Sequence, residues 1–272
     1  MLNASASPEG LIRSLYKNRN LIFSLAKREV VGRYRGSALG LLWSFFNPIF
    51  LLVVYTFVFS VVFQARWGTG SGSRTEFALV LFAGLIVFNF FSECINRAPG
   101  LILGNANYVK KVVFPIEILP CVSALAALFH TLISVLVWLL AYLIFFGLPH
   151  LTVLLFPIIF LPVLFLVMGG SWFLASLGVY VRDVSQFIAI LTTVLMFLSP
   201  IFYPATALPE KYQTLLMLNP LSIGLSQVRD VLFWGNVPSF TLFAVYFIVT
   251  AIFACLGFAW FQKTRKGFAD VI

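Results

Sequence analysis

Six apolar stretches dominate this 272-residue chain, and most of them are long enough to cross a lipid bilayer as a helix. A crossing helix needs about 20 mostly apolar residues. Hydrophobic residues make up 61% of the sequence and charged residues only 10%, whereas a soluble domain is roughly half apolar and about a quarter charged. We therefore expect an all-α, polytopic membrane protein with six transmembrane helices, built as one transmembrane domain over residues 1–272. The six stretches are Leu39–Phe63, Phe77–Ile95, Ile116–Phe146, Leu151–Val179, Val184–Leu198 and Phe240–Phe261.

The basic residues are distributed unequally about these stretches, and the asymmetry predicts the topology. With six crossings, 14 of the 18 Lys and Arg residues fall on the side of the N-terminus. Because loops rich in Lys and Arg stay in the cytoplasm, both termini are predicted to be cytoplasmic. The stretch at 184–198 is short and is alternatively half of a broken span, but five crossings would place the basic tail outside. The net charge of +9 belongs to these flanking loops, so we do not expect a nucleic-acid partner.

Two segments on the predicted cytoplasmic side have their own patterns. Residues 11–35 are basic, and apolar side chains recur in them at near-helical spacing between Leu11 and Ala26. This pattern predicts an amphipathic helix in the membrane interface; the alternative is a solvated basic arm. Residues 97–115 form a predicted cytoplasmic loop with room for a short helix.

The segment 199–238, on the predicted external side, is too apolar for a simple loop and is interrupted by proline and glycine. We expect two short helices here, Pro209–Leu218 and Leu221–Phe233, separated at Asn219-Pro220. Irregular backbone at membrane depth is tolerated only where protein or a water-filled cavity covers it. These helices are therefore predicted to be re-entrant and to line a cavity; the alternative is a surface cap.

The chain carries no motif typical of catalysis or metal binding. A P-loop requires a Gly-Lys dipeptide and none occurs, so we do not expect this chain to hydrolyse ATP, and the energy for any uphill transport would have to come from a partner. No cofactor or metal is expected here. The spans contain few ionisable side chains, which argues against an ion-coupled transporter. Glu93 is expected either to extend to the cytoplasmic interface or to pair with Arg97 one turn on. His130 is expected to be a hydrogen-bonded packing residue, and the three cysteines to be small buried hydrophobes.

The first span combines regularly spaced glycines with aromatic residues. Gly32, Gly36 and Gly40 recur every four residues. They form either a smooth face for close helix packing or a flexible joint between the interface helix and the span. Sugar rings stack on aromatic faces, so aromatic rows on this span are able to line a glycan path; the alternative is that they face lipid. One row is Trp43, Phe46, Phe50 and Phe57, and the other is Phe45, Tyr55, Phe59 and Phe63.

Several motifs resemble those of a known family. The run from Arg33 to Trp43 (RYRGSALGLLW), followed by Asn47-Pro48, resembles the start of the first span in ABC-2 type polysaccharide export permeases. The match covers nearly the whole chain in order and spacing. It is nearest to the membrane subunits of O-antigen exporters, the Wzm type, with teichoic-acid permeases close and capsule permeases more distant. The other motifs are Tyr180-Val181-Arg182-Asp183-Val184, Ser199-Pro200-Ile201-Phe202-Tyr203-Pro204 and Asn219-Pro220-Leu221.

The resemblance implies an assembly and a function. Such permeases are homodimers in the bacterial inner membrane and work with two copies of a separate ABC ATPase, which binds ATP and magnesium and hydrolyses the ATP. They export a long glycan, such as O-antigen, on an undecaprenyl diphosphate carrier, so this chain is expected to be the permease subunit of such an exporter. The alternatives are a teichoic-acid, capsule, small-lipid or drug exporter of the same fold, and an ion-coupled lipid flippase or a channel.

The resemblance also implies roles for particular residues. The interface helix and the loop 97–115 are expected to contact the ATPase, the loop through Asn105, Asn107, Tyr108, Lys110 and Lys111. The aromatic residues expected to line the channel are Trp43, Phe46, Phe50, Tyr55 and Phe57. A basic arm suits a diphosphate head group, and Arg33 and Arg35 are expected to bind it. The residues expected at the external gate are Pro200, Tyr203, Pro204, Asn219 and Pro220.

Overall fold

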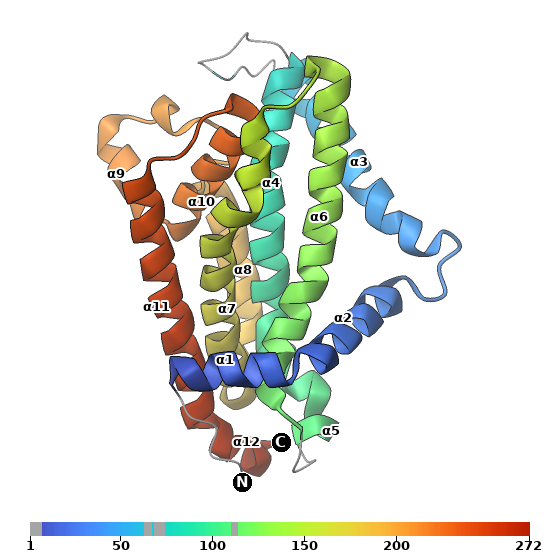
Figure 1. The fold of residues 1–272 in the computed structure, drawn as a ribbon, viewed down its shortest axis with the longest axis vertical. Coiled ribbons are helices and arrows are strands. Elements are labelled where there is room, and N and C mark those ends of the chain that lie inside the picture. The colour runs from blue at the N-terminus through green and yellow to red at the C-terminus, as the bar shows by residue number, and fades with distance from the viewer. Residues whose placement is uncertain (1–6, 63–66, 68–73, 110–113) are drawn as a thin grey trace.

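The computed structural model describes residues 7–62, 67, 74–109 and 114–272, and this part of the chain is helical without any strand. The long helices run side by side, while α1 lies across one end of the bundle (Figure 1). The all-α prediction is therefore confirmed. The helices are α1 (Pro8–Lys17), α2 (Arg19–Tyr34), α3 (Trp43–Tyr55), α4 (Arg74–Arg97), α5 (Ala106–Val109), α6 (Leu119–Phe146), α7 (Phe156–Tyr180), α8 (Val184–Leu198), α9 (Glu210–Leu218), α10 (Pro220–Arg229), α11 (Phe240–Thr264) and α12 (Phe268–Val271).

Five helical segments within these described residues are long and apolar enough to cross a membrane. They correspond to five of the six predicted stretches. The sixth, α8, is an apolar helix of 15 residues, which is shorter than the roughly 20 residues that a crossing requires. The five segments are Gly40–Phe59, Thr75–Gly100, Ile116–Phe146, Leu151–Tyr180 and Phe240–Val271.

Helix α4 forms the centre of the bundle. In its most apolar 18-residue window, 83% of the residues are buried, against 11% in the window that contains α3. This burial follows from its neighbours, because α4 contacts α3, α6, α7, α8 and α10. The indole Nε1 of Trp138 on α6 donates to the backbone oxygen of Leu79 on α4, 2.8 Å away, within this core.

The predicted single helix over residues 11–35 is in fact two helices. The chain changes direction at Asn18, whose side-chain amide donates to the backbone oxygen of Ser14 at 2.8 Å and closes α1. Helix α2 then runs obliquely away from this end of the bundle (Figure 1). It packs against the start of α6 through Ile22 and Ala26, which contact Ile118 and Val122.

The glycines after α2 form a joint and not a packing face. Helix α2 ends at Tyr34, and the chain reverses before α3 begins. Gly36 and Gly40 have φ angles of +88° and +51°, a region that side chains with a Cβ rarely adopt. No atom lies within 4 Å of a Cβ built on either residue. The first of the two interpretations, a smooth helical face, is therefore wrong.

The two short helices expected in residues 199–238 are present. Helix α9 matches the predicted 209–218 within one residue, and α10 continues through Asp230–Trp234 as one wide turn. The side-chain oxygen of Asn219 accepts from the backbone nitrogen of Leu221 at 3.0 Å, and Pro220 occupies the first turn. Asn219-Pro220 thus ends one helix and caps the next. Both helices lie at the opposite end of the bundle from α1 and α12 (Figure 1).

A close helix crossing between α7 and α11 tests the packing of the bundle. Helices α7 and α11 meet at Gly169 and Gly257, where a Cβ on Gly257 would collide with the backbone of Gly169. We expect Gly257→Ala to lower the thermal unfolding midpoint of the detergent-purified protein, since overpacking costs about 1–3 kcal/mol. Gly32→Ala is the matched control, because a Cβ there meets no atom within 4 Å. Equal midpoints for the two variants would contradict the close crossing.

Candidate functional site: an aromatic helix face, a basic end and a buried arginine

Four of the five predicted channel aromatics form an open face on α3. Phe50 and Phe57 are 61% and 58% exposed, and Trp43 and Phe46 are also exposed. The Trp43 and Phe46 rings meet edge to face at 6.5 Å. Tyr55 instead packs against the core, next to Phe59. The structure therefore assigns Tyr55 to the opposite row from the other four.

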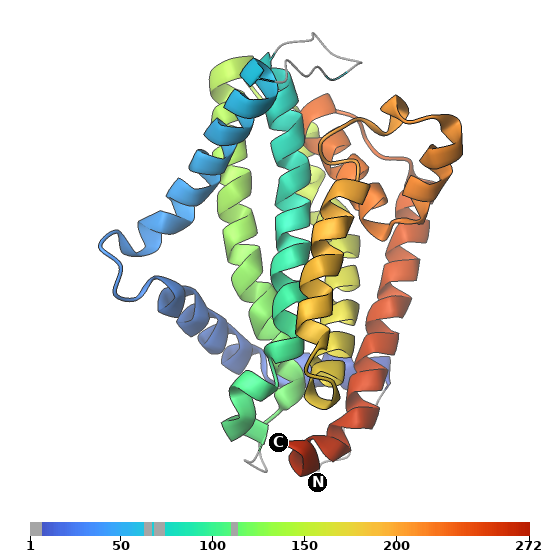
Figure 2. The same cartoon turned by 180° about the vertical axis from the view of Figure 1, so that it is seen from behind.

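A second open apolar face lies on α8, and the sequence analysis did not identify it. Phe187, Ile190, Val194 and Phe197 are all exposed and recur every three or four residues, which places them on one side of the helix. This spacing was visible in the sequence, but it does not distinguish a lipid-facing stripe from a functional one. Helices α3 and α8 both contact α4, and Figure 2 shows them on either side of it.

Aromatic rings join these two helices near the end of α8. Phe59, just after α3, stacks on Phe202 with ring centroids 5.6 Å apart. Phe202 in turn lies 5.8 Å from Phe197 on α8. Tyr203, one of the predicted gate residues, donates from its hydroxyl to the backbone oxygen of Phe197 at 3.2 Å. The segment after α8 therefore contacts both the end of α8 and the residues just after α3.

The predicted head-group arginines occupy different environments. Arg33 forms an ion pair with Glu93 on α4, whereas Arg35 follows α2 and is exposed. Arg97 pairs with Glu29 and lies 3.7 Å from Glu93, so the predicted pairing of Glu93 with Arg97 is confirmed. These ion pairs attach α2 to the end of α4.

The Tyr34–His130 contact lies beside these ion pairs. The Tyr34 hydroxyl is 3.4 Å from Nδ1 of His130, which agrees with the packing role expected for this histidine. Burial raises the pKa of the Tyr34 phenol, so its hydroxyl remains protonated and available as a donor to the ring.

Two of the predicted ATPase-contacting residues lie against α2. Tyr108 accepts a hydrogen bond from Nη2 of Arg28 at 2.9 Å and stacks on Phe114 at a centroid distance of 4.2 Å. Asn105 and Tyr108 line a cavity of about 170 Å³ together with Arg28. Asn107 is exposed. Lys110 and Lys111 lie outside the described residues.

A buried carboxylate connects three further elements at the same end of the bundle. Glu117, only 5% exposed, accepts from Oγ of Ser14 on α1 at 2.9 Å and from Nη1 of Arg265, just after α11, at 2.8 Å. Its backbone oxygen accepts from Nε1 of Trp172 on α7 at 3.0 Å. The sequence showed Glu117 only as the opening of a span, because its partners are more than 50 residues away.

Arg229 is a buried cation that holds the segment 199–238 onto α4. Its Nε donates to the backbone oxygen of Val80 at 3.0 Å, and its two terminal nitrogens donate to the backbone oxygens of Pro200 and Ile201 at 2.5 and 2.8 Å. The guanidinium also lies 4.7 Å from the centre of the Trp67 ring. No ion pair to Arg229 occurs among the described residues. Its charge is thus stabilised by carbonyl dipoles and a ring face.

The remaining predicted gate residues surround this attachment. Asn219 donates from its side-chain amide to Oγ of the buried Ser199 at 2.8 Å, which ties the start of α10 to the end of α8. Pro200 supplies one of the carbonyls that bind Arg229. Pro204 is half-buried and Pro220 is exposed. The segment is therefore a folded unit that is attached at both ends and not a loose loop.

The fold and these sites define a membrane-embedded, all-helical subunit. Residues 20–233 match the model of the ABC-2 type transporter family, and the chain belongs to that family. It is 28% identical over 264 residues to the O-antigen export system permease protein RfbA of Myxococcus xanthus, covering 96% of this chain and 99% of that protein. A Klebsiella pneumoniae protein of the same name is 26% identical and covers 93% and 95%. The polysialic acid transport protein KpsM of Escherichia coli is 25% identical and covers 84% and 88%.

Removing the buried guanidinium of Arg229 tests whether it attaches the segment 199–238 to α4. In Arg229→Met, the carbonyls that bind it lose this donor, and each buried unsatisfied polar group costs about 1–3 kcal/mol. We expect faster backbone hydrogen exchange across α10 and the turn after α8. Arg229→Lys should give an intermediate exchange rate, because a single ammonium group cannot reproduce the planar arrangement of N–H donors of a guanidinium. Arg182→Met is the control, because Arg182 is exposed. If hydrogen exchange in Arg229→Met were as slow as in this control, Arg229 would not attach the segment 199–238 to α4.

Proposed function

We propose that this chain is the membrane permease subunit of an ATP-driven exporter that moves a lipid-linked polysaccharide, of the O-antigen type, across the bacterial inner membrane. The observation that carries the proposal is the open aromatic face of α3, made of Trp43, Phe46, Phe50 and Phe57. Aromatic faces let sugar rings slide past without binding any one sugar tightly. The export functions named for the relatives of similar length support the same conclusion.

The permease is proposed to work as a homodimer with two copies of an ABC ATPase. The aromatic character of the open α3 face supports this arrangement, because a second copy would enclose the open faces of α3 and α8 between the subunits. We propose that these faces form the channel wall. Tyr55, which packs against the core, would then support the wall from behind.

We propose six crossings, with both termini cytoplasmic. Helices α1 and α12 lie at the same end of the bundle (Figure 1), which requires an even number of crossings. The short α8 would complete its crossing together with the folded segment 199–238, which serves as the external gate. Arg229 would hold this gate closed against α4 through its carbonyl contacts.

The lipid diphosphate is proposed to bind where α2 meets α3. Arg35 is exposed next to the glycine joint and suits a negatively charged head group. Arg33 pairs with Glu93, so it would contribute only when that ion pair opens. Binding and gating would then be linked, because Glu93 belongs to α4, the helix to which the gate is attached.

The ATPase is proposed to dock on the surface formed by α2 and the loop 101–109. The Arg28–Tyr108 hydrogen bond joins these two elements, so one docked partner would move both. Closure of the ATPase dimer on ATP would be transmitted through α2 and the Glu29–Arg97 and Arg33–Glu93 ion pairs to α4. From α4 the movement reaches α3 and the gate.

An export assay tests the channel. In a host whose own copy of the gene is deleted, wild-type protein should restore surface glycan. Trp43→Ala combined with Phe46→Ala should leave lipid-linked polymer inside, with about a fivefold or greater loss of surface glycan, since each aromatic contact is worth about 0.5–1.5 kcal/mol beyond its buried area. The matched control is Ile248→Ala with Ile252→Ala, two exposed positions on α11.

The outcomes of this assay separate the candidate functions. Full export by the Trp43/Phe46 variant would contradict an aromatic glycan channel and favour an exporter of small lipids or drugs. Normal surface glycan in the deletion host, with no redundant exporter, would exclude glycan export altogether. Export that persists without any ATPase partner would favour an ion-coupled flippase.

A second experiment tests the coupling surface. Tyr108→Ala removes both the hydrogen bond to Arg28 and the stacking on Phe114. We expect less glycan exported per ATP hydrolysed, about twofold or more, because a typical net hydrogen bond is worth about 0.5–1.5 kcal/mol. Tyr212→Ala, an exposed tyrosine at the opposite end of the bundle, should leave the ratio unchanged. An unchanged ratio in Tyr108→Ala would exclude this surface from coupling.

A further inference from the structure

A groove between α7 and α11 lies outside the proposed channel, gate and coupling surface. It has a volume of about 700 Å³, within the range of about 300–1,000 Å³ typical of sites for small molecules. Its wall is mainly apolar and includes Phe173, Phe253 and Trp260, all of which are exposed. In Figure 1, α11 and α3 lie at opposite flanks of the molecule, so the groove does not face the proposed channel.

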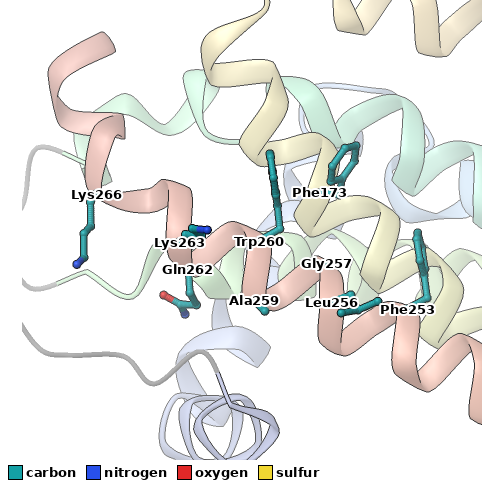
Figure 3. A pocket seen from close by; sticks show the side chains of 9 residues that line it. All are labelled: Phe173, Phe253, Leu256, Gly257, Ala259, Trp260, Gln262, Lys263 and Lys266. Atoms are coloured by element: carbon teal, nitrogen blue, oxygen red, sulfur yellow. The ribbon is translucent and has the colours of Figure 1, made fainter.

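One end of the groove is basic. Lys263 and Lys266 line it and are exposed, and no ion pair to either lysine occurs among the described residues. Gln262 lies beside them, more than nine-tenths buried, and its side-chain nitrogen has no hydrogen-bond partner. Figure 3 shows Lys266, Lys263 and Gln262 at one end of the groove and Phe253 toward the other. This end of the groove therefore offers positive charge and an unsatisfied buried amide to an anionic group.

We propose that this groove binds an anionic glycerophospholipid of the membrane leaflet in which the C-terminal end of α11 lies. Its phosphate would lie between Lys263 and Lys266, and an acyl chain would follow α11 past Trp260 to Phe253. Ten residues separate Lys263 from Phe253, which is about 15 Å at the rise of an α-helix. This is half of the roughly 30 Å hydrocarbon core, or the depth of one leaflet.

The chemistry of the groove selects this occupant. A protein partner would have to bury two lysines at an apolar surface, which is costly without matching acidic groups. A lipid with a phosphate at one end and an apolar chain at the other matches the order of the side chains along α11. The polyprenyl diphosphate proposed as substrate has related chemistry, but the groove faces away from α3, and we assign it to a resident lipid.

Photo-crosslinking of the full-length protein tests the assignment. The delipidated protein would be reconstituted with a photoactivatable phosphatidylglycerol or with the matching phosphatidylcholine, and crosslinked peptides would be mapped. We expect phosphatidylglycerol to label the peptide 253–266 preferentially. Lys263→Gln with Lys266→Gln should lower this labelling about tenfold or more, because each lysine near a membrane surface contributes about five-fold in affinity for anionic lipid.

Two further variants separate a groove from general surface attraction. Arg13→Gln with Lys17→Gln removes the same charge from α1, at the same end of the bundle, and should leave the labelling unchanged. Ala259→Phe fills the groove and keeps both lysines; it should abolish the preferential labelling. Each variant would first be checked for an unchanged thermal unfolding midpoint, with Ala259→Leu as a smaller side chain that still enters the groove if Ala259→Phe does not fold.

Three results would overturn the proposal. One is equal labelling of 253–266 by the zwitterionic lipid. Another is full labelling in Ala259→Phe when that variant is folded. The third is displacement of phosphatidylglycerol by undecaprenyl diphosphate at lower concentration, which would assign the groove to the substrate lipid. None of them depends on glycan export, so failure here and failure of the proposed function are distinguishable.

Discussion

The structure depends on the burial of α4 on all sides. Away from its charged end, α4 provides few polar side chains for its neighbours to bind, so polar groups on those neighbours reach its backbone instead. Trp138 on α6 donates to the oxygen of Leu79, and Arg229 at the end of α10 donates to the oxygen of Val80. At the other end of α4, Glu93 and Arg97 form ion pairs with α2. One helix is therefore attached both to the proposed gate and to the proposed coupling surface.

Exposure of α3 does not by itself imply a partner. Lipid tails are as apolar as leucine, so an open apolar face costs little in a bilayer and there is no hydrophobic drive to cover it. What distinguishes α3 is that its open face is aromatic, begins at a glycine joint, and lies next to the ion pairs of α2. The exposed face of α11 contrasts with it, because aliphatic residues such as Ile248 and Ile252 make up much of that face, as expected for plain contact with lipid.

The sequence predicted the helices well because hydropathy and helix breakers act locally. The limits of α9 and α10 followed from Asn219-Pro220, and the long apolar runs gave the five membrane-length helices. The sequence could not predict the partners of Arg229 or Glu117. Arg229 binds backbone carbonyls, which every residue carries, and Glu117 binds residues that lie far away in the chain. Likewise, four-residue glycine spacing fits both a helix face and a joint, and only the positive φ angles of Gly36 and Gly40 decide between them.

The burial of Arg229 also changes the count of basic residues that predicts the orientation of the protein in the membrane. In the sequence it counts as one of four basic residues on the predicted external side, and each weakens the asymmetry that orients the protein. In the structure its guanidinium is buried and its donors are taken up by backbone oxygens, so it is a packing element and not a loop charge. Only three basic residues then remain on that side, against 14 on the other. The same side chain that attaches the proposed gate therefore strengthens the inference that both termini are cytoplasmic.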